Sequence, residues 1–111
     1  MSSFVRHNVQ IIKKRNEIRH ILRHGHKIKG RYGNFYFYNG HHDGKKIAVL
    51  IKKYVGNAVQ RNYRKRIVRE CIKKNLHILN KYNEVVFLFN YKGEINYQQL
   101  SEEFSNIFIL K

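Results

Sequence analysis

The stretch that decides the fold runs from Lys46 to Cys71 and reads KIAVLIKKYVGNAVQRNYRKRIVREC. Its first eight residues are largely apolar, which is typical of a central strand buried on both faces. Gly56 and Asn57 then break the strand, and Asn57 is a good N-cap for a helix. The sequence therefore predicts a buried strand followed directly by a helix that begins at Ala58 and continues to about Leu76.

This helix is expected to have one apolar face and one face that is almost entirely basic. The apolar face comprises Ile67, Val68, Cys71 and Ile72, and the opposite face comprises Asn62, Lys65, Arg66, Arg69 and Lys73. Arg61 and Arg64 lie nearer the apolar side, so they would have to project past the edge of the sheet. Glu70 is the only acid on the helix, so ion pairs within the helix cannot offset the repulsion. We therefore interpret the basic face as a phosphate-binding surface, in preference to an ordinary solvated face.

The rest of the chain predicts further helices and strands around this unit. Helices are expected at Lys13–Gly25 and after a cap at Asn96, and strands at His26–Lys29, Asn34–Asn39 and Glu84–Phe89. Phe and Tyr alternate in NFYFYN, which is typical of a strand with two different faces. The order of helix, strands, helix, strand and helix predicts a single α+β domain over residues 1–111, in which helices pack on a small sheet. Residues 1–10 are expected to be flexible.

The composition indicates a partner with negative charge. Lys and Arg total 23 against 7 acids, a formal net charge of +16, which disfavours a compact state unless a polyanion takes it up. Nucleic acid is the leading candidate and an acidic membrane surface the second. No stretch approaches the roughly 18 apolar residues of a spanning helix, and the first residues lack the apolar run of a secretory signal. The single cysteine, Cys71, cannot form an internal disulfide, which fits a reducing cytoplasm.

The acids do not suggest a nuclease site in the protein itself. Metal-assisted phosphodiester cleavage needs clustered carboxylates. Only Glu102 and Glu103 adjoin, and neighbours on a helix do not share a face. His20 and His24 have the spacing of two metal ligands on a helix, but no third ligand is near in sequence. We therefore predict no catalytic residue and no metal site.

The residues GNAVQRNYRKRIVRE, from Gly56 to Glu70, resemble the signature of the bacterial ribonuclease P protein subunit, which usually reads GNAVxRNRxKRxxRE. IKKRNEIRHILRHG is similar to the first helix of that family, and EVVFLFNYKGEINYQQLSEEFSNIF to its last strand, loop and helix. The resemblance covers nearly the whole chain. Tyr63 departs from the signature, which usually has an Arg there, and Lys52-Lys53-Tyr54 replaces the more usual Ser-Lys-Lys.

The resemblance implies a fold and a function. The fold would contain a mixed sheet of about four strands, with a left-handed crossover from one strand through the signature helix to the next parallel strand. The function would be that of the auxiliary protein in a ribonucleoprotein endonuclease that removes the 5′ leader from precursor tRNA. The partners would be the catalytic RNA, which uses Mg²⁺ for the chemistry, and precursor tRNA, with no role for DNA or a membrane.

The resemblance also implies two sets of binding residues. The surface for the RNA subunit would comprise Arg61, Asn62, Arg64, Lys65, Arg66 and Arg69. The cleft for the leader, between the first helix and the sheet, would comprise Lys14, Ile18, Leu22, Tyr36, Tyr38 and Lys52. Basic grooves with aromatic platforms are typical sites for single-stranded RNA.

Plainer interpretations of these residues stay open. The two tyrosines could be half-buried packing under a helix, and Ile18 and Leu22 could be ordinary core. A ribosomal or general RNA-binding protein without an enzyme complex is the alternative function. A membrane-surface protein would need exposed apolar helix faces, whereas the apolar stripes of this chain are expected to be used in the core.

Overall fold

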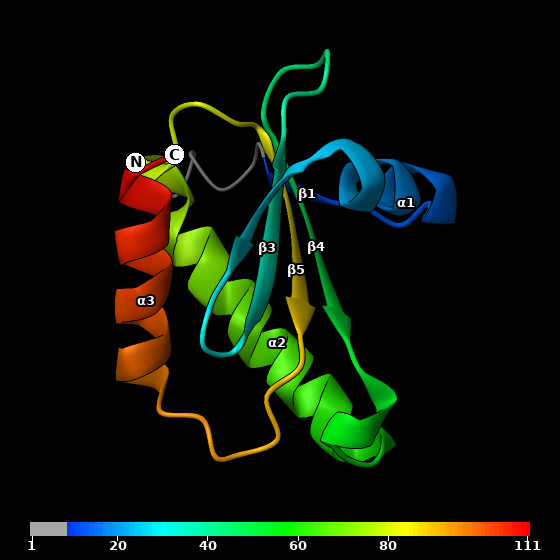
Figure 1. The fold of residues 1–111 in the computed structure, drawn as a ribbon, viewed down its shortest axis with the longest axis vertical. Coiled ribbons are helices and arrows are strands. Elements are labelled where there is room, and N and C mark those ends of the chain that lie inside the picture. The colour runs from blue at the N-terminus through cyan, green and yellow to red at the C-terminus, as the bar shows by residue number, and fades with distance from the viewer. Residues whose placement is uncertain (1–8) are drawn as a thin grey trace.

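The structure is a computed structural model that describes residues 9–111, so most of the segment expected to be flexible lies outside the described residues. The strands are β1 (Val9–Ile11), β2 (His26–Lys29), β3 (Gly33–Tyr38), β4 (Lys45–Ile51) and β5 (Glu84–Phe89). The helices are α1 (Arg15–His24), α2 (Ala58–Asn75) and α3 (Tyr97–Ile109), with short 3₁₀ turns η2 (Lys53–Val55) and η3 (Leu76–Ile78). They form three layers, with α1 on one face of the sheet and α2 and α3 on the other (Figure 1).

The five strands form one mixed sheet in the order β1-β4-β5-β3-β2. β1, β4 and β5 are parallel, whereas β3 and β2 pair antiparallel. The α+β class and the mixed sheet are confirmed, with one strand more than the four or so expected. The additional strand is β1, which occupies residues 9–11 and so begins inside the segment expected to be flexible. A strand of three residues is too short for alternation of side chains to reveal it.

The unit predicted from Lys46 to Cys71 is present. β4 is followed by α2, and Asn57 and Gln60 form a capping box in which each side chain accepts a hydrogen bond from the other's backbone N–H, at 2.9 and 3.0 Å. This satisfies two of the N–H groups that a helix start leaves unpaired. α2 then returns the chain to β5, which lies beside β4 and parallel to it. Val68, Cys71 and Ile72 are fully buried, as the apolar face predicts.

The alternation in β3 decides which side chains meet which helix. Phe35 and Phe37 are fully buried in the larger core, with side chains of α2 and α3. Tyr36 and Tyr38 belong to the smaller core on the opposite face, with Ile21 of α1. The strand therefore separates a face covered by α2 and α3 from a face on which, among the described residues, α1 is the one helix, and the leader cleft is expected on this second face.

Candidate nucleic-acid interface

The polar face of α2 brings most of the expected RNA-subunit residues together. Asn62, Lys65, Arg66 and Arg69 line one shallow hollow, together with Val59 and Tyr63. Val59 and Tyr63 are 77 % and 58 % exposed, so the hollow offers apolar surface beside its cations. Glu70, the one acid of α2, is 3.9 Å from Lys73, one turn along the helix, so it leaves the cations of the hollow uncompensated.

Arg61 and Arg64 lie apart from this hollow and hold loops in place. Arg61 donates to the carbonyl of Gly56 at 2.7 Å, and Arg64 donates to the carbonyls of Tyr91 and Gly93 at 3.2 and 2.9 Å. These bonds fix the start of α2 against the segments that leave β4 and β5. Both side chains reach past the sheet, as expected, and a guanidinium has five N–H groups, so donors remain for a phosphate. The structural role of the two arginines was not foreseen from the sequence.

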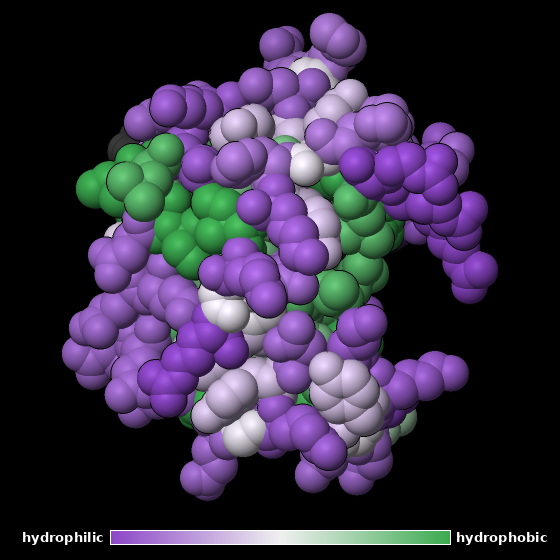
Figure 2. Space-filling model, in the orientation of Figure 1, coloured by the Kyte–Doolittle hydropathy of each residue, from purple (hydrophilic) through white to green (hydrophobic). Residues whose placement is uncertain are grey.

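The face of the sheet under α1 is best described as rows of side chains that run across the strands. The top row is Lys46–Glu84–Tyr38, the middle row is Ala48–Val86–Tyr36–Lys27, and the lower row is Leu50–Leu88–Asn34–Lys29. Ile21 of α1 is buried against the middle row, whereas Leu50 and Leu88 in the lower row are only partly buried. The space-filling view shows a hollow beneath α1 with apolar atoms on its inner wall and hydrophilic side chains above and below it (Figure 2).

The structure gathers part of the expected leader cleft around this hollow. Ile18 and Leu22 pack in the same apolar cluster as Tyr36, which is only 9 % exposed. Lys14 is the N-cap residue of α1, and Lys52 directly follows β4 beyond the lower row, where its N–H donates to the carbonyl of Phe89. Both lysines are exposed.

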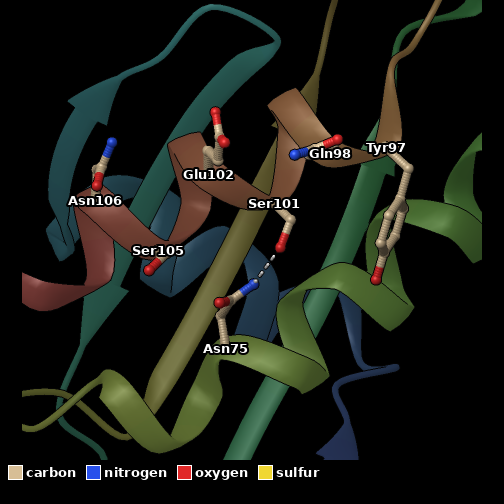
Figure 3. A pocket seen from close by; sticks show the side chains of 7 residues that line it. All are labelled: Asn75, Tyr97, Gln98, Ser101, Glu102, Ser105 and Asn106. Atoms are coloured by element: carbon tan, nitrogen blue, oxygen red, sulfur yellow. Dashed lines mark hydrogen bonds between the residues drawn. The ribbon is translucent and has the colours of Figure 1, made fainter.

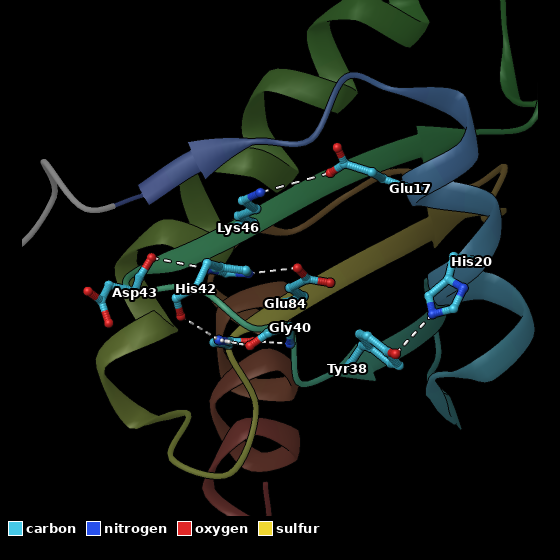
Figure 4. A network of polar contacts seen from close by, with 9 residues as sticks. Glu17, His20, Tyr38, Gly40, His42, Asp43, Lys46 and Glu84 are labelled. Atoms are coloured by element: carbon cyan, nitrogen blue, oxygen red, sulfur yellow. Dashed lines mark hydrogen bonds and ion pairs between the residues drawn. The ribbon is translucent and has the colours of Figure 1, made fainter.

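Tyr38 lies on the other flank of α1. Its hydroxyl is 2.9 Å from Nε2 of His20, and the two rings meet edge to face at 5.1 Å between centroids (Figure 4). Lys46, which shares the row of Tyr38, is six residues from Lys52 along the chain, roughly 20 Å in an extended strand. The structure therefore does not bring Tyr38 and Lys52 to one place.

Sequence reasoning also missed a polar network beside Tyr38. Nε2 of His42 donates to the buried carboxylate of Glu84 at 2.7 Å, and Glu17 of α1 lies 3.9 Å from Lys46 (Figure 4). The amide of Asn83 exchanges hydrogen bonds with the backbone of Gly40 at 2.8 and 3.0 Å. These contacts hold the loop between β3 and β4 and one flank of α1. No sequence pattern indicates them, because their partners are more than 25 residues apart.

The groove between α2 and α3 has a different character. It is lined by Asn75, Tyr97, Gln98, Ser101, Glu102, Ser105 and Asn106 (Figure 3). Asn75 is buried and donates to the carbonyl of Cys71 at 2.8 Å and to the hydroxyl of Ser101 at 3.4 Å. α3 contains two acids and no Lys or Arg. The α3 side of this groove therefore carries no cation, whereas Lys74 of α2 lies 5.6 Å from the centroid of the Tyr97 ring.

Three further features concern metal ligands, the thiol of Cys71 and the apolar length of the helices. Within residues 9–111, no group of three or more His, Cys, Asp or Glu side chains could hold a metal ion. Burial raises the pKa of the Cys71 thiol to about 11, so it is protonated at neutral pH, and its expected place in the core is confirmed. Among the helices described, none is long and apolar enough to cross a membrane.

Known proteins resemble the chain along most of its length. The ribonuclease P protein component of Chlamydia pneumoniae is 30% identical over 96 residues, which are 86% of this chain and 69% of that protein. The corresponding protein of Fusobacterium nucleatum is 26% identical over 102 residues and is covered to 92%.

Solved structures show the same fold. The ribonuclease P protein of Thermotoga maritima superposes with a TM-score of 0.78 at 21% identity, over 90% of this chain and 96% of that one. That of Staphylococcus aureus superposes with a TM-score of 0.76 at 22% identity, over 90% and 93%. The family model described as ribonuclease P matches residues 7–110, and the chain therefore belongs to the ribonuclease P protein family.

Proposed function

We propose that the protein binds the catalytic RNA of ribonuclease P through the polar face of α2 and the 5′ leader of precursor tRNA in the hollow beneath α1. The RNA subunit, with its Mg²⁺ ions, would carry out the cleavage that gives the mature 5′ end. The observation that carries this proposal is the hollow of α2, in which Lys65, Arg66 and Arg69 lie side by side with no acid among them. Such a cluster is suited to the closely spaced phosphates of a folded RNA.

The hollow beneath α1 suits a single strand better than a duplex. Leu50 and Leu88 offer apolar surface on which unstacked bases can lie, and Lys14 and Lys52 offer charge for the phosphates. Ile18 and Leu22 would form the roof and Tyr36 the inner wall. Tyr38 would act from the other flank, where its bond to His20 holds α1 against the sheet.

The protein would contribute binding and not chemistry. Glu84 is buried and already bonded to His42, and Glu17, which lines the same pocket, lies 3.9 Å from Lys46. Among residues 9–111, no group of three or more His, Cys, Asp or Glu side chains could hold a metal ion. Paired carboxylates are what two-metal cleavage of a phosphodiester requires. We place the protein in the cytoplasm, in keeping with its single, buried thiol.

Reconstitution tests the proposal against the alternative of a general RNA-binding protein. The purified protein, the RNA subunit from the same source and a precursor tRNA would be combined at low Mg²⁺, with RNA-only and protein-only controls. We expect the protein to stimulate leader removal by the RNA and to cleave nothing alone. Stimulation no greater than that given by an unrelated basic protein of similar charge would refute the proposal.

A further inference from the structure

Two lysines outside the sites described above lie on the same face as the cleft. Lys27 and Lys29 belong to β2, the edge strand next to β3, and both are exposed. Lys27 pairs with Tyr36 and Lys29 with Asn34, so cross-strand neighbours place both lysines on the α1 side of the sheet. Ile28, between them, packs into the core on the opposite side.

These lysines end the two rows that form the floor of the hollow. Nζ of Lys27 lies 5.9 Å from the centroid of the Tyr36 ring, and Lys29 stands at the end of the lower row that begins with Leu50. Three strand spacings separate Leu50 from Lys29, or roughly 14 Å. This largely apolar floor thus has cations at both ends, Lys52 beyond β4 and the two lysines at β2. A few nucleotides of an extended strand would span this distance.

We propose that Lys27 and Lys29 form a distal phosphate-binding subsite, so that a single-stranded leader crosses the sheet from Lys52 at β4 to the edge at β2. This inference rests on the proposed function. The direction in which the leader crosses the sheet follows from the position of α2. The bond from Arg61 to the carbonyl of Gly56 holds the start of α2 beside the end of β4. The nucleotides nearest the catalytic RNA therefore lie at β4, and those farther upstream reach β2.

No acid of the described chain competes for the two lysines. The ion pairs among residues 9–111 involve other cations, and Glu103, the acid near the end of β2, accepts hydrogen bonds from the backbone N–H of Arg31 at 3.0 and 3.2 Å. A different role for edge lysines is to prevent another chain from pairing with the exposed strand. The two roles differ in their dependence on the sign of the charge. A carboxylate protects an edge as a lysine does, but it repels a phosphate.

Two double variants use this difference. Lys27→Gln/Lys29→Gln removes the charge, and Lys27→Glu/Lys29→Glu keeps a charged edge of opposite sign. Lys74→Gln/Lys81→Gln is the matched control for the Gln variant, because both lysines are exposed, Lys74 lies beside Tyr97 of α3, and the net charge changes by the same amount. Each would be assembled with the RNA subunit, and its affinity for precursor tRNA measured against salt concentration. Leaders would be trimmed stepwise down to mature tRNA.

For long leaders we expect the Gln variant to lower the slope of log K against log salt by about 1.4 units, that is about 0.7 for each lost phosphate contact on a single strand. The Glu variant should bind more weakly still. Both effects should vanish with short leaders and mature tRNA, and the control should match wild type. An equal penalty on mature tRNA, or a Glu variant that binds like wild type, would overturn the inference.

The same measurements separate this inference from the proposed function. If wild type shows no dependence on the leader at all, the proposed leader cleft fails and the subsite fails with it. If wild type depends on the leader but the Gln and Glu variants do not differ from it, only the distal subsite is wrong. A third outcome is that the Gln variant aggregates while the Glu variant keeps normal solubility and normal affinity. That outcome would show that the lysines protect the edge strand, and it would overturn the inference.

Discussion

Replacing Tyr38 by Phe separates its contact with His20 from its proposed role in binding a leader base. The hydroxyl of Tyr38 lies 2.9 Å from Nε2 of His20, and this pair ties α1 to the sheet. A hydrogen bond of this kind contributes about 0.5–1 kcal/mol when part of it is exposed. In a domain of this size, that loss corresponds to a fall in Tm of about 2–8 °C. His20→Ala should cause a similar fall, and the two changes together should cost less than their sum, because they remove the same bond.

The ring of Tyr38 is tested by comparison with Tyr38→Ala. Stacking of one base on an aromatic ring is worth about 1–3 kcal/mol, so loss of a stacked ring weakens binding roughly tenfold or more. If a leader base stacks on Tyr38, the Ala variant should weaken binding of precursor tRNA to the assembled enzyme, and the Phe variant should not. Mature tRNA should bind both variants equally well.

The assay is the affinity of each assembled variant for precursors with progressively shorter leaders, together with thermal unfolding of the free protein. A penalty for Tyr38→Ala that remains after the leader has been trimmed away would remove the ring from the cleft. An unchanged Tm for Tyr38→Phe would show that the bond to His20 does not hold α1. In that case the placement of Tyr38 on a structural flank of the helix would be wrong.

Three other predictions follow from the structure. The double variant Arg66→Ala/Arg69→Ala should stay folded and should lower the slope of log K against log salt for binding to the RNA subunit by about 1.8 units, or 0.9 per phosphate contact on a duplex. An unchanged slope in a binding titration would show that this face of α2 meets solvent. Glu102→Gln and Glu103→Gln should leave cleavage by the assembled enzyme unchanged, and a loss of cleavage rate in single-turnover kinetics would contradict a protein without catalytic carboxylates. Burial raises the pKa of the Cys71 thiol in the folded state from its ordinary 9.0 to about 11, so unfolding releases a proton above pH 9. The free energy of unfolding should therefore fall as the pH rises through this range. Denaturant titrations of the wild type and of Cys71→Ala at pH 8 and pH 10.5 would measure how much of the fall is due to this thiol.

Patterns within a few consecutive residues predicted the two faces of β3 and the start of α2 correctly. The alternation of Phe and Tyr from Phe35 to Tyr38 assigned the two faces of β3 correctly, because side chains along a strand must alternate. Asn57 placed the start of α2 correctly, because few residues can pair the free N–H groups there. The family to which the chain belongs was recognisable from the signature, since its residues are contiguous.

Features that depend on register or on distant partners were not predictable in this way. The lower row of side chains under α1 takes one residue from each of four strands, and a shift of one residue in any pairing would send its side chain to the other face. From the sequence, Arg64 was expected only to bind RNA. Its hydrogen bonds to the carbonyls of Tyr91 and Gly93 could not be foreseen, because these acceptors lie 27 and 29 residues away in the chain. The sequence likewise assigned Tyr38 and Lys52 to one cleft without knowing the register of their strands. Both belong to the sheet face under α1, but Tyr38 shares its row with Lys46, six residues before Lys52 along the chain.

The distribution of charge over the three helices explains how so basic a chain can form a compact fold. α3 carries no Lys or Arg, and apolar contacts with α2 and a hydrogen bond from Asn75 to Ser101 help to hold that half of the molecule together. The uncompensated cations stand instead on the polar face of α2, on the outer side of α1 and at the rim of the hollow beneath it. Charges spread over separate surfaces repel one another less than charges gathered in one cluster, and solvent and salt screen them in the free protein. An RNA that contacts α2 and the cleft together would neutralise both surfaces at once, so the charge that destabilises the free protein is the same charge that makes the complex stable.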